Sequence, residues 1–148
     1  MIRDAKEEDL DQLCDMARRF VEESNLPYTF SPELTRELLW DTICGEDNIL
    51  LVDSHDDILA GAIMGYMERD FCVEYSAYIT KMYVEKEFRG IIATKQLISA
   101  FEKRVGDACV IFASATAGID ERTEKLFVNL FKKSGYIVLG RIMVKNTV

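Results

Sequence analysis

The sequence contains little that could hold a metal ion. Of 148 residues only His55 is a histidine, and the four cysteines stand far apart, with no Cys-x-x-Cys pair. Zinc sites usually draw on closely spaced cysteine and histidine ligands, so the sequence predicts no metal site. The cysteines lie within apolar or element-like segments, which predicts buried free thiols in a reducing compartment. They are Cys14, Cys44, Cys72 and Cys109.

Basic residues are in the minority, with 18 Lys and Arg against 26 Asp and Glu and a net charge of -8. A protein that grips nucleic acid needs clustered Lys and Arg, so we expect no nucleic-acid partner. The acidic excess suits an amine-bearing partner, although surface carboxylates also serve solubility alone. The start MIRDAKEEDL is charged from its third residue, and no hydrophobic run resembles a signal peptide or a membrane span. We therefore expect a cytoplasmic protein without a membrane partner.

The apolar content indicates a single domain over residues 1–148. With 49% hydrophobic residues, the chain can build one well-packed core and is too short for two comfortable ones. From Glu7 to Glu23 apolar side chains recur at spacings of three and four, which predicts a first helix. The Ser-Pro-Glu sequence at 31–33 is typical of a helix start. We expect that second helix to run to about Cys44 and to end at Gly45.

The middle of the chain carries strand patterns. The runs NILLV (48–52) and ILAGAIMGYM (58–67) are rich in residues that favour strands and are separated by the turn-forming DSHDD, so they predict an antiparallel hairpin. The run 71–84 is unusually long for one strand, which indicates a central strand with a bend or a bulge. Asp70 is expected in the turn before it.

The last third alternates between helix and strand. Apolar residues on one face after Gly90 predict a helix, and ACVIFAS (108–114) predicts a buried strand parallel to the strand before that helix. A final helix should be capped by Asp120 and closed by Gly135, and YIVLGRIMV (136–144) should end the chain as strand. The core faces of the two helices are Ala93, Leu97, Ile98, Phe101 and Val105, and Leu126, Phe127, Leu130 and Phe131.

An Arg-Gly pair stands where the central strand gives way to the next helix. The first amides of a helix have no intrahelical acceptor and carry the positive end of the helix dipole, so an anion can bind there. Arg89 would add a positive charge, Gly90 would permit close approach of the backbone, and the Thr94 hydroxyl could donate a hydrogen bond. An ordinary helix start with a solvated Arg89 is the alternative.

The order of the expected elements, with three short sequences, resembles the GNAT superfamily of acetyl-CoA-dependent N-acetyltransferases. These sequences are IRDAKEEDLDQL near the N-terminus, ITKMYVEKEFRG leading into a loop of the form R/Q-x-x-G-x-G/A, and LFVNLFKKSGYIVLG, which is similar to a closing segment LYxxxGFxxxG. The resemblance covers nearly the whole chain. It implies an α/β fold with a central mixed, mostly antiparallel sheet flanked by about four helices, and an acyltransferase with acetyl-CoA as cosubstrate.

The resemblance also implies where acetyl-CoA binds. Its pyrophosphate would rest on the backbone amides of the loop, and its pantetheine arm would pair with the end of the preceding strand. Ile92 stands where the second glycine of the loop is expected and Thr94 where Gly or Ala is usual, but contacts made by the backbone tolerate such changes. The residues implied are Met82, Tyr83, Val84, Arg89, Gly90, Ile91, Ile92, Ala93, Thr94 and Phe131.

Phe131 corresponds to the tyrosine proposed in this family to protonate the departing CoA thiolate, and Glu124 to a frequent asparagine. A phenyl ring cannot donate a proton, and loss of a general acid costs about two to four orders of magnitude in rate. A thiolate with a pKa of about 8 to 9 can still leave without assistance. We expect acetyl transfer to a primary amine, on a small molecule or a protein, by direct attack in a ternary complex. The alternative is a weak or inactive domain that binds acyl-CoA or a protein partner.

Two groups of residues are candidates for handling the amine. Acetylation needs a neutral amine and hence a base. In a regular strand Glu74 and Tyr78 share the side of Met82, which makes both catalytic candidates, although a bulge would shift that parity. Each can also be a surface carboxylate or a packed aromatic residue. The segment between the first two helices could bind a cation through its carboxylates and the face of an aromatic ring. The alternative is that this segment only connects the helices. The candidates there are Glu22, Glu23 and Tyr28.

Three further features have weaker interpretations. His55 lies in a hairpin turn that this topology places far from the loop, so we expect it to be solvated. Lys132 and Lys133 could meet the 3′-phosphate of CoA or could simply complement the helix dipole. The terminal RIMVK (141–145) could pair between subunits if its edge is exposed, which would make a homodimer.

Overall fold

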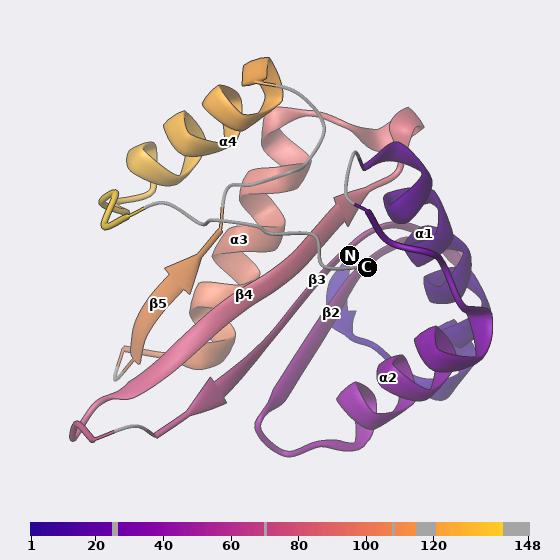
Figure 1. Cartoon of the computed structure of the whole chain (residues 1–148), viewed down its shortest axis with the longest axis horizontal. Helices are drawn as coiled ribbons and strands as arrows, with labels where there is room; N and C mark the ends of the chain where they lie inside the picture. The colour runs from indigo at the N-terminus through magenta and orange to yellow at the C-terminus, as the bar shows by residue number, and fades with distance from the viewer. Residues whose placement is uncertain (25–26, 70, 108, 115–120, 141–148) are drawn as a thin grey trace.

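The computed structural model describes residues 1–24, 27–69, 71–107, 109–114 and 121–140, and Figure 1 shows how its elements are arranged. The strands are β1 (Ile2–Asp4), β2 (Asn48–His55), β3 (Ile58–Glu68), β4 (Tyr75–Val84) and β5 (Cys109–Ala113). The helices are α1 (Leu10–Glu23), α2 (Pro32–Cys44), α3 (Ile91–Val105) and α4 (Glu121–Lys133), with short 3-10 turns η1 (Glu7–Asp9) and η2 (Lys86–Phe88).

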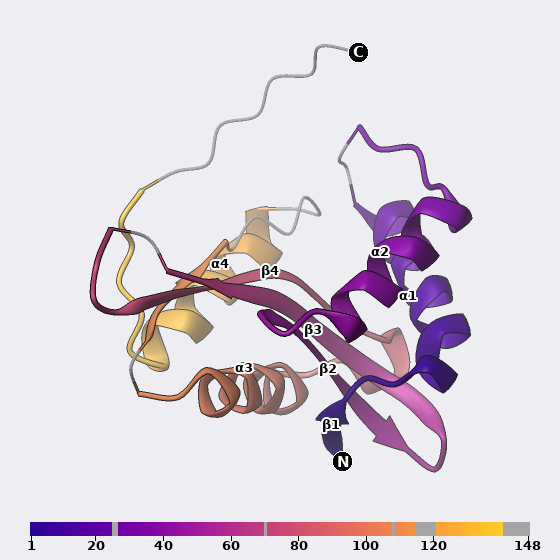
Figure 2. The ribbon, with the colours of Figure 1, turned by 90° about the horizontal axis from the view of Figure 1, so that it is seen from below.

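The five strands form one sheet in the order β1-β2-β3-β4-β5. The first four pair antiparallel, and β5 pairs parallel with β4 after the chain has passed through α3. Helices α1 and α2 pack on one face of the sheet, and α3 and α4 contribute to the core on the other (Figure 2). The expected mixed, mostly antiparallel sheet with four helices is confirmed.

Strand β2 is apolar without interruption because helices cover both of its faces. Ile49 and Leu51 belong to the core beneath α3, whereas Leu50 and Val52 belong to the core beneath α1 and α2. Side chains alternate between the two faces of a strand, so each residue of the run finds an apolar environment. The centre of the α3 core is Phe101, which is fully buried.

The helix ends follow the expected capping chemistry. The Ser31 hydroxyl accepts a hydrogen bond from the Leu34 amide at the start of α2, and Gly45 ends that helix. After α4, Gly135 adopts a φ of 93°, in the left-handed region that glycine enters without a steric penalty. These ends were predictable because capping depends on residues that are neighbours in the sequence.

Strand β4 carries the expected bulge but begins later than expected. The sequence predicted a strand over 71–84, whereas β4 starts at Tyr75 and the residues before it form bends. Its pairing with β3 shifts at one point: Met64 of β3 lies opposite Lys81, and the next residue, Gly65, lies opposite Ile79. Thr80 is therefore an extra residue in β4, and it reverses the side on which later side chains lie.

Several expectations for the C-terminal half are wrong. Within the described part of the sheet β5 lies at the edge, so Val110 and Phe112 are exposed rather than buried. Leu126 is 56% exposed, because α4 meets the core only from Phe127 onward. Residues 136–140 form no strand, and the apolar side chains at 137–139 are exposed.

The thiols are less buried than expected. Cys14 is half-buried, but Cys44 and Cys72 are exposed, because the first ends α2 and the second lies in the bends before β4. Outside the described residues lie Asp70, Asp120 and the segment 141–148 with RIMVK, together with the side chain of Cys109.

The buried carboxylate of Asp9 holds the N-terminal strand against the first helix. Arg3 donates to both of its oxygens at 2.7 and 2.9 Å, and the Lys6 amide donates at 2.8 Å. The hydrogen bonds from Arg3, joined by that of Lys6, outweigh burial and lower the pKa of Asp9. A carboxylate with a lowered pKa stabilises the folded state above its unfolded pKa of about 3.9 and loses this effect as the pH falls further.

We expect Asp9→Asn to lower the free energy of unfolding by about 1 to 3 kcal/mol at pH 7, since hydrogen bonds to a charged group are lost. The difference from the wild type should shrink as the pH falls below about 4. Urea denaturation between pH 7 and pH 3 measures both. Asp11→Asn is the control, because the exposed pair of Asp11 and Arg36 should contribute nothing measurable. A difference that stays constant down to pH 3 would contradict this assignment.

Candidate active site

The end of β4 has a free backbone edge. Strand β5 pairs with β4 only from Tyr75 to Ile79. Beyond Ile79 and the bulged Thr80, residues 81–84 pair with β3 on one side, and no described strand pairs with their other side. An extended ligand can form strand-like hydrogen bonds along such an edge, and Met82, Tyr83 and Val84, expected to bind the pantetheine arm, all lie on it.

This edge leads through η2 into the N-terminus of α3. The first amide of α3 to bond within the helix is that of Thr94, which donates to the Gly90 carbonyl at 3.2 Å. The helix has no side-chain cap and no acidic residue in its first turn. The amides at 91–93 thus lack intrahelical acceptors and can receive an anion. A Cβ on Gly90 would meet nothing within 4 Å, so there is open space beside these amides.

The side chains of this turn are engaged within the protein. Arg89 folds back, donating from Nε to the Val84 carbonyl at 2.8 Å and from Nη2 to Glu23 at 2.6 Å. Arg89 is therefore paired within the protein, with its side chain still 39% exposed, and an ordinary helix start remains the alternative. The Thr94 hydroxyl donates to the Gly90 carbonyl at 3.1 Å. In this conformation it is not available to donate to a phosphate, the role that was expected for it.

Glu23, the last residue of α1, ties that helix to the end of β4. Its carboxylate accepts from Tyr83 Oη at 2.8 Å and from Arg89, and Lys86 lies 3.6 Å away. Burial would raise the pKa of Glu23, but the hydrogen bonds from Arg89 and Tyr83 outweigh it and lower that pKa. Burial, together with the hydrogen bond to Glu23, raises the pKa of Tyr83 to about 12. The Glu23 charge is thus already neutralised by two cations.

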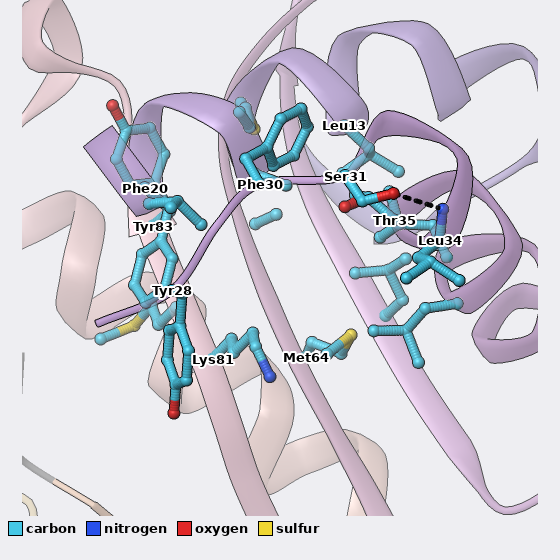
Figure 3. Close-up of a pocket in the computed structure, with 18 of the residues that line it drawn as sticks. Leu13, Phe20, Tyr28, Phe30, Ser31, Leu34, Thr35, Met64, Lys81 and Tyr83 are labelled. Atoms are coloured by element: carbon cyan, nitrogen blue, oxygen red, sulfur yellow. Dashed lines mark hydrogen bonds between the residues drawn. The ribbon is translucent and has the colours of Figure 1, made fainter. Parts of the chain in front are cut away.

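An apolar pocket of about 300 Å³ lies between the α1–α2 pair and strands β3 and β4 (Figure 3). Its walls include side chains from both helices, from their connection and from the sheet. Among the described residues that line it, Lys81 on β4 is the only charged one, and none is a carboxylate. Representative wall residues are Leu13, Phe20, Phe30, Leu34 and Met64.

The three residues expected to bind the acceptor are not brought together. Tyr28 lines the apolar pocket, but Glu22 and Glu23 line a separate groove of about 770 Å³ alongside α1. There Glu22 pairs with Arg18 at 2.9 Å. The sequence analysis also missed Lys81. This residue reaches the pocket because of the position of the β4 bulge, and no sequence pattern indicates where the bulge lies.

Because of the bulge, Tyr78 does not share the side of Met82, contrary to expectation. Ala77 and Ile79 face the α3 core before the bulge, and Met82 faces it afterwards. Tyr78 consequently lies on the opposite face, stacked between Tyr66 and Phe112 at centroid distances of 5.0 and 5.1 Å. Desolvation and the charge of nearby Glu68 raise the pKa of Tyr78, so its phenol is protonated at neutral pH.

Glu74 lies outside β4. It is exposed in the bends that precede the strand, at the end opposite to the Arg89 turn. Phe131 is only 7% exposed and packs edge-on against Tyr136, with ring centroids 5.0 Å apart. The phenyl ring therefore belongs to the core beneath α3.

His55 lies nearer to the candidate site than expected. Its ring stacks on Phe88 with centroids 5.5 Å apart, and its Nε2 lies 3.1 Å from Asp53 Oδ2. Antiparallel pairing places the start of β3 beside the end of β4, which brings the hairpin turn next to η2. Within the described ranges no group of three or more His, Cys, Asp or Glu side chains could hold a metal ion, and no helix there is long and apolar enough to cross a membrane.

Comparison with known proteins gives one match in sequence. The model of the acetyltransferase (GNAT) family matches residues 11–136. This range contains α2, α3, α4, β2 to β5 and all of α1 after Leu10, together with the free β4 edge and the α3 N-terminus. Among curated proteins no sequence matches significantly.

Solved structures share the fold at low identity. A possible acetyltransferase from Clostridium difficile 630 has a TM-score of 0.77 at 16% identity, over 100% of this chain and 97% of that one. A predicted acetyltransferase from Clostridium acetobutylicum, solved with acetyl-CoA, has a TM-score of 0.68 at 18% identity, over 99% and 95%. An aminoglycoside acetyltransferase from an uncultured soil metagenomic sample, in complex with sisomicin, has a TM-score of 0.69 at 15% identity, over 100% and 95%.

Proposed function

Because the chain belongs to the acetyltransferase (GNAT) family, we propose that it transfers an acetyl group from acetyl-CoA to a primary amine by direct attack in a ternary complex. Acyl transfer is the activity of the family, whereas the amine and the mechanism are the proposal. The observation that carries it is the continuity of two features: the free edge of β4 beyond Ile79 leads through η2 into the uncapped N-terminus of α3.

This continuity suits a long ligand with an anionic group at one end. The amides at 91–93 would hold the pyrophosphate of acetyl-CoA, with the space beside Gly90 admitting it. The edge from Met82 to Val84 would pair with the pantetheine arm. Arg89 would act by holding the turn against Glu23 and Val84. Bound in this way, acetyl-CoA supplies an activated thioester.

Few groups are candidates to accept or donate the protons that acetyl transfer moves. A primary ammonium must lose a proton before it attacks, and the described part of the chain places no carboxylate in the lining of the apolar pocket beside β4. Tyr78, on the pocket face of the sheet and protonated at neutral pH, is suited to donate a proton. Glu74 is exposed and would act as a base only through solvent. Amines that are already partly neutral at the working pH should therefore react fastest.

Binding without turnover is the second candidate function. It is favoured by Phe131, which stands where a proton donor is expected and is itself buried. In that case the β4 edge and the α3 N-terminus would bind acyl-CoA, and no reaction would take place at the apolar pocket.

Thermal denaturation with acetyl-CoA tests the proposal. A ligand that binds only the folded state stabilises it by about 2.7 kcal/mol at a concentration of 100 Kd, so we expect Tm to rise. Arg89→Ala should shrink this ligand-induced rise, because the turn loses its attachment to Glu23. The control is Arg18→Ala, which removes a different arginine pair on α1 and should leave the rise unchanged.

The second arm is CoA release measured across a broad panel of primary amines. Release that depends on both substrates supports acetyl transfer. A rise in Tm without release from any amine would favour binding alone. No rise in Tm would remove both functions that involve acetyl-CoA.

A further inference from the structure

The side chains that line the apolar pocket are suited to bind a hydrophobic group. Aromatic and aliphatic side chains line it, among them Phe20 from α1, Phe30 from the α1–α2 connection and Leu34 from α2. Its volume of about 300 Å³ lies at the lower end of the range for small-molecule sites. Polar polyamines and sugars would lose their hydration in such a site without finding partners for their polar groups.

The charge in the pocket is positive. Of the described residues that line the pocket, Lys81 is the only charged one; it is exposed and forms no ion pair with any of the others described. In the view of Figure 3 its amine extends from β4 toward Met64. Two acidic residues of α1, Glu22 and Glu23, line the other groove and are neutralised there by arginine and lysine. A second cation in the pocket would be repelled, whereas a carboxylate would form a charge-assisted hydrogen bond with Lys81.

The pocket adjoins the strand proposed to hold the thioester. Lys81, Met82 and Tyr83 line it, and all three lie on the part of β4 that has the free edge. A molecule that fills the pocket therefore lies against the same strand as the proposed pantetheine arm.

We propose that the acceptor is an amine with a large apolar body and a carboxylate, of which a hydrophobic α-amino acid is the simplest example. Its side chain fills the apolar pocket and its carboxylate pairs with Lys81. This inference rests on the proposed function for its chemistry. The amine nitrogen forms an amide bond with the acetyl carbon, the C–S bond breaks, the thiolate leaves as CoA, and the surplus amine proton passes to solvent.

The test compares phenylalanine with two molecules that keep its body and its amine but lack its carboxylate, phenethylamine and phenylalaninamide. Spermidine represents polycationic acceptors. For each we measure binding in the presence of CoA by calorimetry and acetylation by CoA release. We expect phenylalanine to bind about 10 to 100 times more tightly than the other three, the ratio for a hydrogen bond between charged groups.

Lys81→Met tests the source of that preference. It keeps an unbranched side chain and removes the charge, so the ratio between phenylalanine and phenethylamine should fall to near one. Lys103→Met, the same substitution in the last turn of α3, should leave the ratio unchanged. The Tm of each variant shows that it is folded.

The outcomes separate the inference from the proposed function. Tighter binding of spermidine, no binding of phenylalanine, or a ratio that Lys81→Met does not change would overturn the inference. Acetylation of other amines in those cases would leave the proposed function standing. Binding of phenylalanine that depends on Lys81, without CoA release from any amine, would support the inference about the pocket and overturn acetyl transfer.

Discussion

Replacing Ile92 with glutamate should greatly weaken acetyl-CoA binding and leave the ligand-free protein at least as stable as the wild type. Ile92 is 74% exposed in the first turn of α3, which contains no acidic residue. A carboxylate at a helix N-terminus interacts favourably with the helix dipole, by about 0.3 to 1 kcal/mol. The same carboxylate would occupy the region proposed for the pyrophosphate.

The expected loss of affinity is large because like charges repel strongly at short range. Two unit charges about 4 Å apart interact by about 4 kcal/mol at the effective dielectric constant near a protein surface. Because Ile92 is exposed, solvent and salt reduce this value, and we expect a loss of about a hundredfold or more. Calorimetric titration with acetyl-CoA measures it.

Ile92→Gln is the matched control, since it has the length and polarity of glutamate without the charge. It should keep most of the affinity, because the proposed contacts come from backbone amides. Equal affinities for the Glu and Gln variants would mean that the phosphates do not bind at the start of α3. A loss of stability in the ligand-free Glu variant would instead show that its effect is on folding.

Replacing Gly65 with alanine should leave little folded protein. A Cβ at this position would lie 2.1 Å from the Tyr78 carbonyl oxygen and 2.7 Å from the Phe101 ring. The carbonyl belongs to the backbone of β4, next to the bulge, and Phe101 is fully buried at the centre of the core, so neither can move without disturbing the sheet. Overpacking usually costs about 1 to 3 kcal/mol, and contact with the backbone should bring this case to the upper end or beyond.

Gly90→Ala is the control for this effect. Its Cβ would meet nothing within 4 Å, and its φ of 176° is extended backbone that alanine also adopts, so stability should change by less than about 0.5 kcal/mol. Soluble yield and urea denaturation of the two variants give the comparison. Similar free energies of unfolding for both would refute the close packing of β3, β4 and α3 around Gly65.

Local sequence was sufficient for most of the fold because most elements depend on neighbouring residues. Apolar spacing defined α1, Ser31 and Gly45 marked the ends of α2, and the continuous apolar run of β2 predicted a strand. The Arg89-Gly90 turn was found in the same way, since a strand followed by a helix start is a local pattern. These features allowed the family resemblance to be stated from the sequence, and the family match over residues 11–136 confirms it.

The roles of individual side chains were decided only by the tertiary structure. The extra residue at Thr80 places Tyr78 and Met82 on opposite faces of the sheet, and no local pattern specifies where a ladder of hydrogen bonds slips. Glu23 is neutralised by Arg89, which lies 66 positions along the chain, so its charge could not be assigned from its neighbours. The sequence by itself determined which elements form, through spacing and capping. The tertiary structure alone decided which face each side chain occupies and which charge it meets, because both depend on pairing between distant segments.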